Sequence, residues 1–160
     1  MAVDLDTIRG LIKTRLENIT GTTVAHKYVP SNLNEADCPQ WLIVPAEATH
    51  GRVERQGAPP FTGGHATVRT WRLILLLCKS SDMPYGDDES ALDPFFERVE
   101  DEFTAHIKLG SSDPQLLMAW LASDTGPARF QFPPNSGLWW FGCEWKLNVR
   151  VNRQGVATGV

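Results

Sequence analysis

The arrangement with the clearest chemical meaning is a carboxylate and an ammonium group two residues apart, Glu144 and Lys146. On a β-strand alternate side chains share one face, so both groups would point the same way. Some metal-dependent nucleases use this spacing, with the carboxylate holding Mg²⁺ and the lysine stabilising developing charge. Such a site needs a further acidic group from a neighbouring strand, and the strands predicted at residues 40–45 and 66–78 contain none. A solvated strand face with a weak ion pair is the simpler interpretation, and a nuclease is the alternative.

A zinc site is also conceivable from this sequence. His50 and His65 flank a segment rich in glycine and proline and could meet across it, with Cys38 as a third ligand. Zinc sites normally show pairs of ligands at short fixed spacing, and no such pair of histidines occurs here. Phosphate-binding glycine loops and nucleophile motifs placed after a strand are absent as well. We therefore expect no catalytic residue, no metal and no cofactor, and we do not expect an enzyme.

Length, charge and cysteine content narrow the classes of protein to which the chain could belong. The chain has 160 residues, a length typical of one domain, and a formal net charge of −4. This charge argues against sequence-independent binding to nucleic acid, which needs a basic surface. Cys78 and Cys143 lie in apolar segments and are expected in the core, so we expect no disulfide framework and a reducing compartment. The first residues do not form a signal peptide, and the longest apolar run, Leu73–Cys78, is too short to span a membrane.

The strongest structural signal lies in the last third of the chain, where apolar residues occupy every second position. They are Trp139, Phe141, Cys143, Trp145, Leu147, Val149 and Val151. A period of two over this length predicts a long strand with one buried face and one solvated face. Trp140 is the exception on the polar face. It either packs under a loop or anchors an interface with another protein.

Two segments have the periodicity of amphipathic helices. The first is capped by Asp4 or Asp6 and ends at Thr20-Gly21, and its apolar positions are Leu5, Ile8, Ile12, Leu16 and Ile19. The second is expected to begin at Asp93-Pro94 and to end at Gly110, with an apolar face formed by Phe95, Phe96, Val99, Phe103 and Ile107.

The remaining elements are strands. Residues 40–45 predict a short strand that ends at Pro45, and residues 66–78 predict a long strand whose second half is apolar on both faces and therefore central. Residues 115–121 fit either a short helix or a buried strand, and residues 128–132 fit a short strand. The order of elements predicts an α+β fold: a mostly antiparallel sheet with two main helices packed on one face.

Residues 46–65 differ from the rest because they combine four glycines and two prolines with very few apolar residues. A connection of this length in a compact domain usually has a function, and we interpret it as an arm inserted into a single domain of residues 1–152. Residues 153–160 are expected to form a frayed tail. Mixed charge on the arm suits contact with a neighbouring molecule, and the candidate interface residues are Arg52, Val53, Glu54, Arg55, Phe61 and Trp140.

The layout also resembles one known family. The segments that support the resemblance are, in order, LDTIRGLIKTRLENI, the long Gly/Pro-rich loop, RTWRLILLLCKS, ALDPFFERVEDEFTAHI and WWFGCEWKLNVRVN, which together span about residues 4–152. This pattern is similar to the tail-terminator, or tail-completion, proteins of long-tailed bacteriophages. The tip of the arm, APPFTGGH, has no counterpart in the family pattern.

The resemblance implies a structural protein of the virion, made in the cytoplasm of the host bacterium. Such proteins form a ring, commonly a hexamer, at the head-proximal end of the tail tube. They stop tube polymerisation and join the tail to the head, so the implied partners are other copies of the chain, the tube protein and a head-completion or connector protein. DNA passes through the bore without sequence-specific binding, and no cofactor or membrane is involved. A neck adaptor on the portal side of the joint is the alternative, because such proteins share the same layout.

Overall fold

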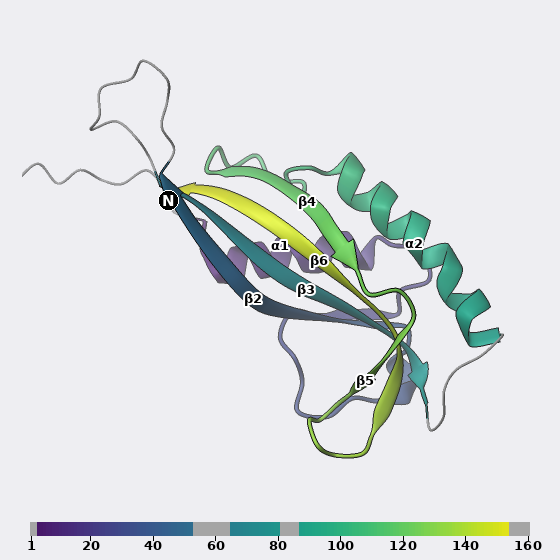
Figure 1. Cartoon of the computed structure of the whole chain (residues 1–160). Coiled ribbons are helices and arrows are strands. Elements are labelled where there is room, and N and C mark those ends of the chain that lie inside the picture. Colours follow the sequence, from purple (N-terminus) through teal and green to yellow (C-terminus); the bar gives the residue numbers. More distant parts are fainter. Residues whose placement is uncertain (1–2, 53–64, 81–86, 154–160) are drawn as a thin grey trace, which may run out of the picture.

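The computed structural model describes residues 3–52, 65–80 and 87–153, without the side chains of a few residues beside the gaps (Figure 1). Its elements are α1 (Leu5–Glu17), β1 (Val24–His26), the 3₁₀ turn η1 (Glu35–Asp37), β2 (Gln40–Arg52), β3 (His65–Lys79), α2 (Asp87–Ala105), β4 (Leu116–Asp124), β5 (Ala128–Gln131) and β6 (Trp139–Arg153). The strands form one six-stranded sheet in the order β1-β2-β3-β6-β4, and β5 pairs with β6. Only the β1–β2 pair is parallel. The predicted α+β class is therefore confirmed. None of the described helices is long and apolar enough to cross a membrane.

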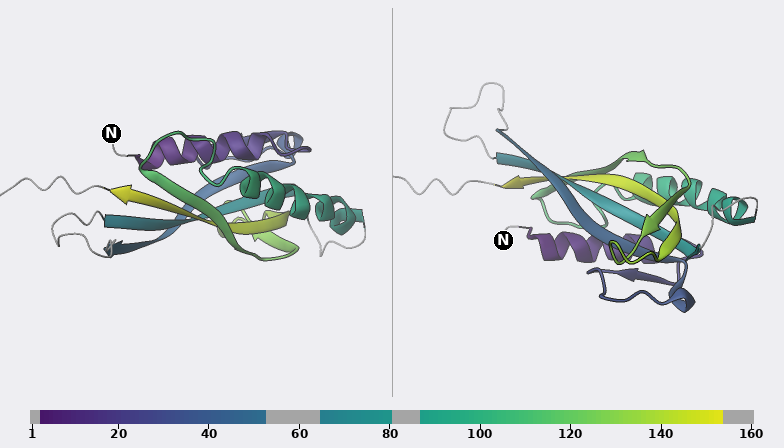
Figure 2. Two further views of the ribbon diagram at one scale, coloured as in Figure 1. Left: turned by 90° about the horizontal axis from the view of Figure 1, so that it is seen from above. Right: turned by 60° about the horizontal axis from the view of Figure 1, so that its bottom comes forward.

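The predicted long strand is β6, and its alternation sets the main core. Six of the seven odd-numbered side chains are buried, and Trp139 at the beginning of the strand is half-buried. Trp145 lies between the sheet and the helices, with its ring centroid 5.3 Å from Trp41 and 5.5 Å from Phe96 of α2. Figure 2 shows α1 and α2 on the same side of the sheet, and their apolar side chains join this core.

Helix α1 forms largely as its sequence predicts. The Asp4 carboxylate caps the first turn by accepting a hydrogen bond from the Thr7 N–H at 2.7 Å, and the apolar stripe is buried from Ile8 to Ile19. The helix ends at Glu17, before the predicted Thr20-Gly21 stop. The chain turns only at Gly21, whose φ of 97° requires the left-handed conformation that glycine tolerates.

The predicted start of the second helix is wrong. Helix α2 begins at Asp87, and Pro94 lies inside it. Proline inside a helix removes one backbone hydrogen bond, so another interaction must stabilise the first two turns of α2. Leu92 is completely buried in the core beside Phe95, and this burial offsets the loss.

The predicted end of the second helix is also wrong. Helix α2 stops at Ala105, and the following residues form turns. Ile107 is 51% exposed and does not belong to the apolar face. Leu109 and Gly110 both have positive φ, which ends any helical path and directs the chain into β4.

Strand β2 does not end at Pro45, contrary to the prediction. It continues through a bulge between Pro45 and Ala48 and pairs with β3 as far as Arg52 opposite His65. Proline is tolerated here because it lies on the edge of the sheet beyond the short β1. Part of the predicted arm, residues 46–52, is therefore sheet. The arm residues 53–64 lie outside the described residues.

Residues 116–124 form β4, so the helical alternative for residues 115–121 is wrong. Leu116 and Ala119 of β4 are buried against β6, and this pairing decides between two conformations that the local sequence allows equally. Strand β5 confirms the short strand predicted near residues 128–132. Arg153 still belongs to β6, and the predicted tail beyond it lies outside the described residues.

A second apolar cluster lies on the other face of the sheet. Its buried members are Leu42, Ile74, Leu76 and Trp140, and partly buried residues from the loop before β2 and from around β5 cover it. Strand β3 is apolar on both faces here, as predicted for a central strand. The sheet is thus covered on both faces at one end and only by helices elsewhere (Figure 2).

Close packing of β3 against β6 gives a direct test of this arrangement. A Cβ atom on Gly142 would lie 1.7 Å from the backbone oxygen of Leu75, whereas one on Gly10 of α1 would meet only the flexible end of Lys27 at 3.7 Å. Gly142→Ala should therefore destabilise the fold by about 3 kcal/mol or more. Gly10→Ala should stabilise it by up to about 1 kcal/mol. Urea unfolding of both variants measures this, and equal stabilities would contradict the register of the central pair.

Candidate functional site

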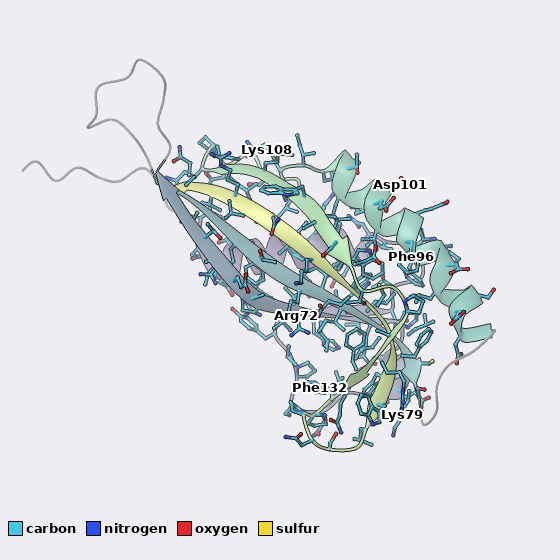
Figure 3. The ribbon with its side chains drawn as sticks, in the orientation of Figure 1. Arg72, Lys79, Phe96, Asp101, Lys108 and Phe132 are labelled. Carbon is cyan, nitrogen blue, oxygen red and sulfur yellow. The ribbon has the colours of Figure 1, made fainter. Side chains whose placement is uncertain are left out.

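The open face of the sheet, opposite the helices and away from the second cluster, carries the charged pair singled out by sequence, Glu144 and Lys146. The register places Lys146 of β6 opposite Arg72 of β3, and Asn148 opposite Thr70. A shallow hollow of about 390 Å³ lies there, lined by Ala46, Glu47, Thr70, Arg72, Ala122, Glu144, Lys146 and Asn148. Figure 3 shows Arg72 at the centre of this face.

Glu144 is held in this hollow by an ion pair. Its side chain is only 8% exposed, and the guanidinium group of Arg72 contacts its Oε1 through both Nε and Nη2. Its backbone N–H donates to Thr125 Oγ1 at 3.1 Å. Lys146, two residues on, is exposed. Glu144 is therefore a buried carboxylate whose charge is already balanced by its own sheet.

The structure supplies one acidic residue that the sequence analysis did not find. Glu47 lines the same hollow as Glu144 and Lys146, because β2 continues past Pro45 through its bulge. The sequence analysis ended the strand at Pro45 and so placed Glu47 in a loop. Only the bulge, which lets the strand continue, brings Glu47 onto the sheet. In the described part of the chain, no three His, Cys, Asp or Glu side chains are placed to hold a metal ion. Glu47 thus supplies the further carboxylate that the nuclease alternative requires, whereas the ion pair of Glu144 with Arg72 favours the structural interpretation.

The conceived zinc ligands do not converge. His50 pairs in register with Thr67 and His65 pairs with Arg52, so the two histidines lie near each other on adjacent strands. Cys38 precedes the opposite end of β2, and the rise of a strand places it roughly 30–40 Å from the two histidines along the chain. The suggested site of two histidines and Cys38 is therefore wrong.

The cysteine thiols are poor nucleophiles at neutral pH. Burial raises the pKa of the Cys78 thiol to about 11 and that of the Cys143 thiol to about 11. Burial also raises the pKa of the Cys38 thiol. The thiolate is the reactive form, so none of these three groups is activated for covalent chemistry.

The candidate interface residues fall into three groups. Trp140 is 2% exposed, its ring is packed in the second cluster, and its Nε1 donates to the Phe132 carbonyl at 3.3 Å. It therefore packs under the β5 region and offers no surface to a partner, so the interface alternative for Trp140 is wrong. Arg52 is the last residue of β2. Val53, Glu54, Arg55 and Phe61 lie outside the described residues.

The base of the arm is a regular antiparallel ladder. Strands β2 and β3 pair step by step from Ala48 opposite Arg69 to Arg52 opposite His65, and β6 continues beside them to Arg153. All three strands end together, at the end of the sheet remote from the second cluster (Figure 1). The arm therefore starts from a fixed three-stranded base.

The ion pair of the open face can be tested by stability. Arg72→Ala leaves the buried Glu144 carboxylate without its cation and should cost about 2 kcal/mol, reduced from the value for a fully buried pair because Arg72 is 41% exposed. Glu144→Gln leaves only a solvated guanidinium and should cost about 1 kcal/mol. Lys146→Ala, on the same face but exposed, serves as the control and should change stability by less than about 0.5 kcal/mol. Chemical denaturation measures all three, and an unchanged Arg72→Ala variant would contradict a structural role for the pair.

Comparison of the chain with models of known protein families finds no match, and comparison with curated proteins finds none either. Its function therefore has to be argued from the fold and from the surfaces that the fold presents.

Proposed function

We propose that this chain is a structural protein of a long-tailed bacteriophage virion, made in the bacterial cytoplasm. It assembles as a ring, a hexamer by analogy with the family, on the head-proximal end of the tail tube. There it ends tube polymerisation and forms the joint with the head. Its partners are its own copies, the tube protein and a head-completion or connector protein.

The observation that carries the proposal is the rigid base of the arm in a fold with the expected order of elements. An N-terminal helix, a long hairpin, a second helix and a late amphipathic strand follow one another, and the hairpin and the late strand pair in one sheet; this is the layout on which the resemblance rests. The hairpin stays paired to its last described residues, so residues 53–64 begin at a fixed position at one end of the sheet. A segment presented in this way suits contact with a neighbouring subunit or the tube.

The chemistry of the described surface supports the same role. The polar face has its buried carboxylate paired with a guanidinium, and the thiols are protonated at neutral pH. The net charge of −4 weakens non-specific attraction to DNA, which suits a ring through which DNA must pass.

The arm can be tested without disturbing the sheet. Deletion of residues 50–64 would also remove three steps of the ladder, whereas joining Arg52 to His65 by an Asn-Gly turn preserves them. We expect this variant to melt like the wild type but to form no rings and cap no tail tubes, because the contact with the neighbour is gone. Native mass and electron microscopy of tubes measure this.

A matched control separates the sequence of the arm from its length. Replacement of residues 53–64 by a Gly/Ser linker of equal length should also abolish assembly if the side chains of the arm make the contact. Normal rings from the Asn-Gly variant would refute the role of the arm.

A further inference from the structure

We propose that the outer edge of β2 at Ala48–Arg52 accepts an added strand from a second copy of this chain, and that the added strand is residues 154–160 of that copy. The inference deepens the proposed ring, on which it rests, because it names a second contact, beside that of the arm, that would join one subunit to the next.

Among the described residues, no strand pairs with the outer edge of β2 in this region. Strand β1 pairs with β2 only at Gln40–Leu42. Just beyond, Arg9 Nη1 donates to the Ile43 carbonyl at 3.3 Å. From Ala48 to Arg52 no described strand lies on this side of β2, and its backbone groups are available for pairing.

The register shows which of these groups point outward. The Ile43 carbonyl points away from β3, so the pair of Ile43 with Leu73 is one that exchanges no backbone hydrogen bonds. Because such pairs alternate with hydrogen-bonded ones, the backbone groups of the even-numbered residues of β3 point toward β2. Val68 is one of these, and after the bulge it lies opposite Thr49. Thr49 therefore bonds with β3, and the residues whose N–H and C=O groups point away from β3 are Ala48, His50 and Arg52.

The two edges of the sheet differ in their protection. Exposed edges are normally blocked by proline, bulges or covering segments. Strand β4, at the other edge, has bulges at both ends, and its Ala119 N–H donates to the Ile107 carbonyl at 2.6 Å. Pro45 and the bulge protect only the first part of β2. The regular stretch Ala48–Arg52 contains neither, so it is the edge open to strand addition.

Residues 154–160 have the composition of a strand for such an edge. The sequence QGVATGV is uncharged and places β-branched residues at Val156, Thr158 and Val160, with small residues between them. Seven residues extend over roughly 23 Å, and five residues of edge over roughly 17 Å, at the rise of a strand. The segment is thus long enough to pair along the whole open edge.

The geometry favours a neighbour over the same subunit. Strand β6 ends at Arg153, and both β3 and β2 lie between it and a strand added at the open edge, a distance of about 14 Å at three strand spacings. The segment would have to cross that distance and turn back, which leaves too few residues to pair with its own β2. A contact in which each copy donates at one place and accepts at another is heterologous, and such contacts build a ring when the rotation from one subunit to the next closes.

Disulfide trapping in the full chain tests the contact. In a background with Cys38→Ser and Cys78→Ser, Thr49→Cys is combined with Val156→Cys, Ala157→Cys or Thr158→Cys, which covers both faces of the added strand. We expect at least one pair to give a ladder of covalent oligomers that ends at a closed ring. Each single-cysteine variant should give none. Dimers from Thr49→Cys alone would indicate two-fold pairing of β2 edges, and a cross-link within one chain would indicate the chain's own segment. Either result, or no cross-link in any pair, would overturn the inference.

A matched pair of proline variants tests the edge itself. His50→Pro removes an outward N–H and should leave the melting temperature close to that of the wild type but reduce trapping by about tenfold or more, as expected from lost hydrogen bonds. Thr49→Pro breaks the ladder with β3 and should unfold the hairpin. Undiminished trapping in the His50→Pro background would contradict strand addition. Tube capping, measured separately, distinguishes the two proposals. Capping without cross-linked oligomers refutes only this contact, and cross-linked oligomers without capping refute only the tail function.

Discussion

The pairing of β3 with β6 is the constraint on which the rest of the molecule depends. The two strands run together from His65 opposite Arg153 to Lys79 opposite Trp140, with one shift of register near Leu76. Because side chains alternate along a strand, this register decides which residues share a face. It places Trp145 against the helices and leaves Glu144 on the opposite side. The close approach of the strands at Gly142 leaves no room for a Cβ atom there, so only glycine fits this position.

The same pair explains why the sheet has two unlike ends. Where β3 is apolar on both faces, a second cluster forms around Trp140 and the sheet is buried on both sides. Toward the base of the arm the face opposite the helices becomes polar, and a buried carboxylate needs the guanidinium of Arg72. Burial of an unpaired charge is costly, so this ion pair is a condition for keeping Glu144 in the sheet. The charged pair on the open face is thereby explained by its contribution to the stability of the fold.

The features suited to assembly gather at one end of the sheet. The hairpin, the last residues of β6 and the open stretch of the β2 edge all end there, whereas the β4 edge is blocked by bulges and by the segment after α2. A subunit with one open edge and a chain segment leaving from the same end has different surfaces for giving and receiving a contact. Such asymmetry is what a head-to-tail ring requires, whereas a two-fold dimer requires one self-complementary surface.

The sequence by itself determined the elements whose signals are long and periodic. The alternation in β6, the apolar stripe of α1 and the doubly apolar centre of β3 each contain enough buried side chains to dominate local preferences. Short signals were overridden by tertiary packing: Pro94 lies inside α2 because Leu92 is buried, β2 passes Pro45 through an edge bulge, and β6 makes a strand of residues 116–124. Of the candidate site, the sequence identified Glu144 and Lys146. Only the tertiary structure brought Glu47 beside them, paired Glu144 with Arg72 and buried Trp140, because these depend on register and on which chain segments cover each face.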